Sequence, residues 1–374
     1  MFIHDTARNE NRFAAYVGRL QAHYRAGDRS QLAVLVIAAL VVGSFLSILF
    51  SMTTGASDAS AFDVVRELIG GQASQSAMSA RDRIIVFDIR LPRAILGFII
   101  GGSLAVSGAV MQGLFRNPLA DPGLVGVSSG ASLGAVSMIV LGGTVAAPVY
   151  QALGIFALPA AAFLGGLVTT LVLYRVATRN GQTSVATMLL AGIALGALAM
   201  ALTGVLIYMA DDKQLRDLTF WSMGSIAGAT WTKILAAGPI MLLCLAVVPF
   251  LARGLNAITL GEAAAFHMGV PVQKLKNIAI VSVAASTGAS VAVSGGIGFV
   301  GIVVPHLLRL VIGPDHRFLL PAAALLGGSL LLFADVIART LVAPAELPIG
   351  IITSAVGGPF FLWILLRNRS RLSL

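Results

Sequence analysis

The chain has 374 residues, of which 57% are hydrophobic and only 11% are Asp, Glu, Lys or Arg, and its mean hydropathy is +0.91. A soluble domain carries about 25% charged residues, so this chain has too little polar surface for a water-soluble globule. The composition predicts an all-α, polytopic membrane protein and excludes a soluble enzyme, a disordered chain and a disulfide scaffold. Basic residues gather on the cytoplasmic side of membrane proteins, so the net charge of +9 gives no reason to expect nucleic acid as a partner.

Ten stretches are apolar enough to be membrane spans, each of which needs about 20 apolar residues. In chain order they are Leu32–Phe50, Leu91–Leu114, Leu124–Leu141, Val149–Val176, Ala186–Met209, Ile234–Leu251, Ile278–Val293, Ile297–Ile312, Phe318–Val342 and Leu347–Leu366. The two short stretches on either side of Gly295-Gly296-Ile297-Gly298 are also compatible with one broken helix. Pairs of glycines four residues apart, such as Gly97 and Gly101, predict tight packing between helices.

The polar segments predict the orientation of the chain. With helix-end charges assigned to the nearer side, the inner segments hold 16 Lys and Arg against 6 Asp and Glu, and the outer segments hold 9 against 10. We therefore expect a cytoplasmic N-terminal segment (1–30), a single transmembrane domain (31–366) and a cytoplasmic tail (367–374). Within the domain, 51–90 is expected to be a periplasmic loop and 252–277 a cytoplasmic loop.

Few groups in the sequence are suited to catalysis or to coupling with an ion gradient. The lone cysteine, Cys244, lies in an apolar stretch, and the five histidines form no metalloprotease motif. Asp335 is the one acidic residue inside an expected span, and it predicts an exposed helical ion pair with Arg339, four residues later. We expect no catalytic residue and no metal site, and we expect any transport to be powered by a partner.

Several segments carry a resemblance to a known family. They are Arg90-Leu91-Pro92-Arg93, Ser107–Gly113 (SGAVMQG), Arg116–Gly126 (RNPLADPGLVG), Gly295–Arg309 (GGIGFVGIVVPHLLR), Ala334–Arg339 (ADVIAR) and Glu346–Gly350 (ELPIG). Together they resemble the permease subunits of type II ABC importers for ferric siderophores, haem and cobalamin. The resemblance implies a cobalamin-importer-like fold of ten transmembrane helices in the bacterial inner membrane, with both termini cytoplasmic.

The resemblance also implies an assembly. Two permeases form a homodimer, two ATPase subunits bind on the cytoplasmic side, and a periplasmic substrate-binding protein docks on the other side. The permease is then not an enzyme and binds no cofactor, because ATP and Mg²⁺ belong to the partner ATPase. Haem is the favoured cargo, and a ferric siderophore or cobalamin is the alternative. An ion-coupled secondary transporter is the alternative from another class, and it would need ionisable groups near the middle of the membrane.

Three sets of residues match functional positions of that family. For docking of the binding protein they are Arg90, Arg93 and Arg339, whose alternative role is that of helix-end arginines reaching towards water. For coupling to the ATPase they are Gly261, Glu262, Ala265, Phe266, His267, Met268 and Gly269, for which an ordinary loop is the alternative. For the cytoplasmic gate they are Thr183 and Ser184, although an alignment from the following Leu-Ala-Gly would select Ala186 and Thr187.

Two further expectations follow from the resemblance. The fifth and tenth spans are expected to line the pathway. His306 and Arg309 follow Pro305 in a pattern that the family shares, so a structural role is favoured over iron ligation by His306.

Overall fold

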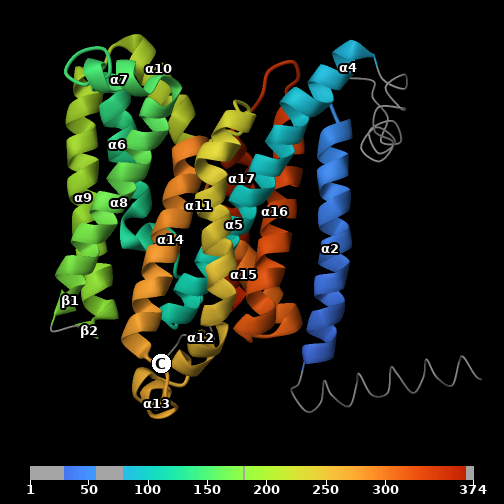
Figure 1. Cartoon of the computed structure of the whole chain (residues 1–374), viewed down its shortest axis with the longest axis vertical. Helices are drawn as coiled ribbons and strands as arrows, with labels where there is room; N and C mark the ends of the chain where they lie inside the picture. Colours follow the sequence, from blue (N-terminus) through green and yellow to red (C-terminus); the bar gives the residue numbers. More distant parts are fainter. Residues whose placement is uncertain (1–28, 56–78, 180–181, 368–374) are drawn as a thin grey trace, which may run out of the picture.

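The computed structural model describes residues 29–55, 79–179 and 182–367, and they form a bundle of helices that run along one common axis (Figure 1). The main helices are α2 (Ser30–Thr53), α5 (Leu91–Leu114), α6 (Val127–Leu141), α8 (Ala157–Ala177), α9 (Val185–Met209), α11 (Trp231–Val247), α14 (Val272–Ser294), α15 (Val300–Ile312), α16 (His316–Thr340) and α17 (Ile349–Arg367). In these described ranges, 7 helical segments are long and apolar enough to cross a membrane, and α6, α15 and α17 are shorter apolar helices. The expected set of ten apolar helices is confirmed.

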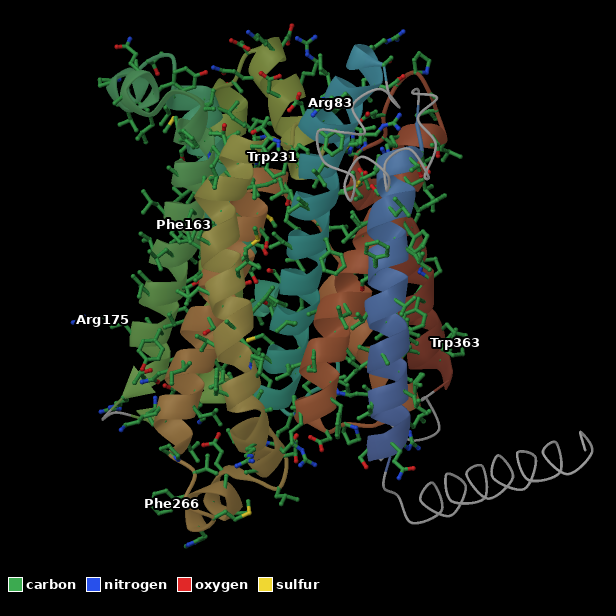
Figure 2. All side chains as sticks on the ribbon, turned by 45° about the vertical axis from the view of Figure 1, so that its right-hand side comes forward. Arg83, Phe163, Arg175, Trp231, Phe266 and Trp363 are labelled. Atoms are coloured by element: carbon green, nitrogen blue, oxygen red, sulfur yellow. The ribbon has the colours of Figure 1, made fainter. Side chains whose placement is uncertain are left out.

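Short elements gather at the two ends of the bundle. One end carries α4 (Ala80–Ile84), α7 (Ala147–Leu153) and α10 (Asp212–Ser222), as Figure 1 shows. The opposite end carries α12 (Ala252–Ile258), α13 (Glu262–His267) and a small antiparallel hairpin of β1 (Thr178–Arg179) and β2 (Gln182–Thr183). We call these the α4 end and the α13 end. In Figure 2, Arg83 marks the first and Phe266 the second.

The centre of the bundle is α5, which is buried along almost its whole length and packs against α16, α14, α15 and α11. Glycines allow this close packing. A Cβ atom on Gly108 would lie 1.9 Å from the backbone oxygen of Gly301, and one on Gly101 would lie 2.3 Å from that of Gly327. These separations leave no room for a side chain, so α5 meets α15 and α16 backbone to backbone, as the glycine spacing predicted.

Two expected spans begin or run differently in the structure. The stretch predicted from Leu124 becomes helical only at Val127, because Asp121 caps a 3-10 turn at Pro122–Val125 by accepting a hydrogen bond from the Gly123 amide at 2.8 Å. The stretch predicted as Val149–Val176 is divided into α7 and α8, with a 3-10 turn at Gly154–Phe156 between them. Gly154 has a φ of 52°, which ends α7.

The glycine-rich segment near residue 295 separates two helices. α14 leaves the α13 end, whereas α15 returns towards it alongside the second half of α5, where Arg309 reaches Gln112. The turn between them requires a φ of 70° at Gly295, whose missing Cβ would lie 2.1 Å from the backbone oxygen of Trp221. The alternative of one broken helix is therefore wrong.

Parts of the expected segments lie outside the described residues. They are 1–28 of the N-terminal segment, 56–78 of the predicted periplasmic loop and 368–374 of the tail. The predicted loop 252–277 is described throughout, and it contains α12, α13 and the first turn of α14. The side of the membrane on which this segment lies stays a prediction.

Candidate functional site

The structure brings Arg90, Arg93 and Arg339 together at the α4 end. Arg90 and Arg93 lie at the start of α5, and Arg339 lies in the last turn of α16. All three are withdrawn from the surface: Arg90 is 5% exposed, and the side chains of Arg93 and Arg339 are 8% and 7% exposed. A buried guanidinium needs acceptors inside the protein, and each of these arginines has them.

Arg93 is the centre of an ion-pair network that joins α5 to α16. Its Nε and Nη2 atoms both donate to the Asp335 carboxylate, at 3.0 and 2.8 Å, and its Nη1 atom donates to Glu346 at 3.0 Å. Asp335 is 1% exposed, and its distance to Arg339 Nε is 3.6 Å. The predicted ion pair of Asp335 with Arg339 is thus present, but the prediction that it is exposed is wrong. Close packing of α5 on α16 buries Asp335 and gives it Arg93 as its main partner.

The other two arginines bind the C-terminal end of α2. Arg90 Nη1 donates to the backbone oxygen of Met52 at 3.0 Å, and Arg339 Nη2 donates to that of Ser51 at 2.6 Å. The last carbonyl groups of a helix carry partial negative charge and lack partners within the helix, so cations are favourable there. The exposed cations nearest in sequence to this cluster are Arg81 and Arg83, in α4.

At the α13 end, the predicted coupling segment forms a short helix between two glycines. Gly261 and Gly269 have φ values of 109° and 82°, which allow the chain to turn sharply before and after α13. Ala265 is fully buried and fixes the helix on the bundle, whereas Phe266 and Met268 are 69% and 55% exposed. Figure 2 shows Phe266 at the extremity of the molecule, away from the bundle. The segment thus presents two large apolar side chains to the outside.

The predicted gate residues lie beside this segment. The hairpin and α13 enclose a groove of about 1030 Å³, whose lining includes Thr183, Ser184, Glu262 and Phe266. Residues that the sequence separates by about eighty positions thus share one groove. No local pattern in the sequence could indicate this.

The two gate candidates differ in their surroundings. Thr183 is 4% exposed, and its hydroxyl group lies 2.8 Å from that of Thr178 on the paired strand. Ser184 is exposed and caps α9, accepting a hydrogen bond from the Thr187 amide at 3.3 Å. Ala186 and Thr187, the positions that the other alignment selects, are also exposed. Only Thr183 is therefore fixed inside the protein.

The groove residues that were not selected from the sequence include Gln273 and Lys276 of α14. Gln273 Nε2 donates to the Thr183 hydroxyl at 2.7 Å, and Gln273 Oε1 accepts from the Thr183 amide at 3.0 Å. Lys276 is 3% exposed. Helical spacing could have indicated it, because Lys276 precedes the buried residues Ile280 and Val283 by four and seven positions.

His306 and Arg309 have structural surroundings. The Arg309 guanidinium donates to the Gln112 side chain, whose Nε2 atom donates to the backbone oxygen of Gly301 at 3.1 Å. The His306 ring meets Phe360 edge-on, with ring centroids 6.0 Å apart. In the part of the chain that the structure describes, no three His, Cys, Asp or Glu side chains are placed to hold a metal ion.

The bundle of apolar helices is that of a polytopic membrane protein. The model of the FecCD transport family matches residues 34–367, and the chain belongs to that family of ABC importer permeases. The hemin transport system permease protein HmuU of Yersinia pestis is 45% identical over 89% of this chain and 97% of its own length. The cobalamin import system permease protein BtuC of Halobacterium salinarum is 45% identical over 77% of this chain and 74% of its own.

Solved structures share the fold. One, described as an inward-facing conformation of a metal-chelate type ABC transporter, has a TM-score of 0.76 at 29% identity and covers 89% of this chain and 99% of its own. PsaBC from Streptococcus pneumoniae in complex with Fab has a TM-score of 0.50 at 18% identity and is similar in fold alone, covering 76% of this chain and 94% of its own. The expected permease fold is confirmed.

Proposed function

We propose that this permease imports haem, as a homodimer in the bacterial inner membrane, and that ATP hydrolysis by two partner subunits powers the transport. The cargo follows from the hemin permease of Yersinia pestis, which matches nearly the whole of both chains. The cobalamin relative makes cobalamin the second candidate, and it matches a smaller share of each chain. The permease itself binds no cofactor, since ATP and Mg²⁺ belong to the ATPase.

The observation that carries the proposal is the exposed α13 segment. Phe266 and Met268 are large apolar side chains at the tip of the molecule, on a helix that Ala265 holds against the bundle. Exposed apolar groups of this kind mark contact surfaces. In this proposal the ATPase buries them, and its opening and closing displace α13. The α13 end is then cytoplasmic, as are both termini, in agreement with the exposed basic residues Arg175, Arg179, Arg253 and Lys274 in the inner segments.

The α4 end is then periplasmic and receives the binding protein. The cluster at this end has three guanidinium groups, of Arg90, Arg93 and Arg339, against two carboxylates, and so it keeps a positive charge that favours an acidic partner. Glu346 is the more accessible carboxylate, with 39% of its side chain exposed. In docking, an acidic side chain of the binding protein takes the place of Glu346 on Arg93.

The gate belongs to the hairpin at the α13 end. Thr183 and Ser184 stand directly before α9, which we expect to line the pathway with α17. Ser184, Ala186 and Thr187 are exposed, so they are available to narrow a pathway between two permeases, whereas buried Thr183 anchors them.

The experiment is purification of the tagged permease with its ATPase and binding protein, followed by uptake into proteoliposomes. Haem, a ferric siderophore and cobalamin are compared, each with ATP and with a non-hydrolysable analogue. We expect the ATPase to co-purify and haem to accumulate only with ATP. Uptake driven by a proton or sodium gradient without ATP would overturn the mechanism. Preferential uptake of cobalamin or of the siderophore would overturn the cargo and leave the mechanism intact.

A further inference from the structure

Lys276 is a buried cation at the α13 end to which the proposed function gives no role. It belongs to the second turn of α14, and its residue is 3% exposed. Its Nζ atom donates to the backbone oxygen of Thr183 at 2.9 Å and to the Glu262 carboxylate at 2.7 Å. One ammonium group therefore joins the β1–β2 hairpin to the first residue of α13.

Because this ammonium group is buried, it must keep hydrogen-bond acceptors within the protein. An ammonium ion that has lost its water is stable only with acceptors around it, and removing one partner of a buried pair leaves an uncompensated charge. Thr183 and Glu262 must both stay within reach of the same Nζ atom. When α13 moves relative to α14, either the hairpin follows or the ammonium group loses an acceptor.

The hairpin passes this constraint on to α9. Thr183 is the last residue of β2, and Ser184 directly after it is the N-cap of α9. The Ser184 amide donates to the backbone oxygen of Ala177 at 3.0 Å, which fixes the closing pair of the hairpin. A displacement of Thr183 therefore acts on the first turn of α9, where the candidate gate residues lie.

Gln273 provides an internal comparison. Its side-chain amide makes two hydrogen bonds with Thr183, at 2.7 and 3.0 Å, and one with Asn277 at 2.8 Å. These bonds hold the hairpin on α14, and none of them involves α13. Gln273 thus stabilises the hairpin, whereas Lys276 stabilises it and also ties it to the coupling helix. The two roles can be separated by experiment.

We propose that Lys276 is the positioning residue that transmits movement of α13 to the gate, through its two bonds to Glu262 and to the Thr183 backbone. The proposal rests on the proposed function, in which an ATPase displaces α13. Lys276 touches neither cargo nor nucleotide in this role. It sets how many cargo molecules are moved for each ATP hydrolysed.

The test uses the complete complex of permease, ATPase and binding protein in proteoliposomes, with haem uptake and ATP hydrolysis measured in the same sample. Lys276→Met keeps an unbranched side chain that is shorter by one atom, and it removes the charge. We expect it to lower uptake per ATP by about tenfold while the ATPase remains bound, in the range usual for coupling between sites. Lys276→Arg keeps both bonds possible and should restore most of the coupling. Lys274→Met removes the same charge from an exposed position two residues earlier. Its uptake per ATP should equal that of the unchanged protein.

A second variant tests the same link from a surface position. Glu262 has 42% of its side chain exposed, so Glu262→Gln is expected to fold even if Lys276→Met does not. It should also lower uptake per ATP. A spin label at Arg179→Cys, in a Cys244→Ala background, should report hairpin movement on ATP binding in the unchanged complex and little movement in either variant.

The outcomes separate this proposal from the one on which it rests. If the ATPase does not bind the unchanged permease, the proposed function fails. If the ATPase binds and uptake per ATP in both Lys276→Met and Glu262→Gln equals that of the unchanged complex, Lys276 has no coupling role and the proposed function stands. A loss of uptake and of ATPase binding together in both variants would make Lys276 a structural residue only, and would also overturn the coupling role.

Discussion

The candidate docking cluster at the α4 end and the candidate coupling segment at the α13 end differ in which side chains they expose. At the α4 end, charged groups face inward: Asp335 is 1% exposed and the Arg93 side chain 8%. At the α13 end, an apolar side chain faces outward, with Phe266 69% exposed. Buried ion pairs contribute to one defined arrangement of the helices, whereas exposed apolar groups contribute little to folding and gain their value when a partner covers them. The arginine cluster at the α4 end therefore helps to fix the helices, whereas in the proposed function the apolar face of α13 is covered by a partner.

The largest expected effect comes from removing the central arginine of the ion-pair network at the α4 end. Arg93→Ala leaves the Asp335 carboxylate buried beside Arg339 alone, at 3.6 Å, with its main partner removed. Removing one member of a buried pair costs about 3–5 kcal/mol, so the midpoint of thermal unfolding in detergent should fall sharply. The measurement is scanning fluorimetry of the purified permease.

The control for this prediction removes both charges. Arg93→Met together with Asp335→Leu replaces the pair by apolar groups of similar size, which is often close to neutral. The double variant should therefore unfold at a higher temperature than Arg93→Ala. If the two variants unfold at the same temperature, the ion pair is not what the single substitution disrupts.

The next largest effect is expected from replacing the exposed aromatic side chain at the α13 end. Phe266→Asp places a charge where the ATPase is proposed to bury a ring, and central aromatic contacts of an interface contribute about 2–4 kcal/mol. ATPase binding should weaken by about 30-fold or more, measured by co-purification and by titration with labelled ATPase. The unfolding temperature of the permease alone should not change, since the side chain is largely exposed.

Phe266→Leu is the matched variant, because it keeps an apolar side chain at the same position. It should retain most of the binding. ATPase binding that is equally strong in all three proteins would show that the contact surface lies elsewhere on the α13 end.

The fold was predictable to a large extent because each helix that crosses a bilayer needs a long apolar stretch, which can be recognised in the sequence. Apolar length placed α5 at the same bounds as the structure, Leu91–Leu114. The errors arose where backbone geometry acts on a few residues. The cap at Asp121 delays α6, and the positive φ of Gly154 divides α7 from α8. Hydropathy averages over a window and does not register such local turns.

The site was predictable where its residues are neighbours in the sequence, and not where the tertiary fold brings them together. The segment 261–269 contains both its apolar residues and its turning glycines. Helical spacing indicated the contact of Asp335 with Arg339, but not its closer partner Arg93, which is 242 positions away. Helical spacing could have indicated that Lys276 is buried, but not its two acceptors, Thr183 and Glu262, which come from separate segments.

A smaller effect sharpens the assignment of the gate at the α13 end. Ser184→Ala removes the side-chain cap of α9 and should cost about 1 kcal/mol of stability. If Ser184 also narrows the pathway, uncoupled leakage of haem through the permease should rise while thermal stability falls little. Thr187→Ala is the comparison, because the other alignment selects that exposed position. Leakage that rises only in Thr187→Ala would assign the gate there.

At the α4 end, a comparable test concerns docking. Glu346→Gln removes the more accessible carboxylate from Arg93 and leaves the buried pair with Asp335 in place. If an acidic group of the binding protein replaces Glu346, docking should strengthen several-fold at low salt and converge with the unchanged protein at high salt. Binding kinetics with immobilised permease provide the measurement. Weaker docking in this variant would mean that Glu346 itself contacts the binding protein.

The smallest effect concerns a cap at the α13 end and has a defined pH dependence. Burial tends to raise the pKa of Asp315, but hydrogen bonds from Arg317 and from Asn256 outweigh it and hold the pKa of this carboxyl below its ordinary value. A carboxyl with a lowered pKa in the folded protein stabilises it above the ordinary Asp pKa of about 3.9, and this contribution is lost as the pH falls through the folded value. Because the Arg317 side chain is 60% exposed, the contribution stays below about 1 kcal/mol.

Asp315→Asn keeps a capping oxygen, so it should unfold at a slightly lower temperature at pH 7 and at the same temperature as the unchanged protein below about pH 3. A difference that persists at the lower pH would assign the effect to packing of the side chain and not to its charge.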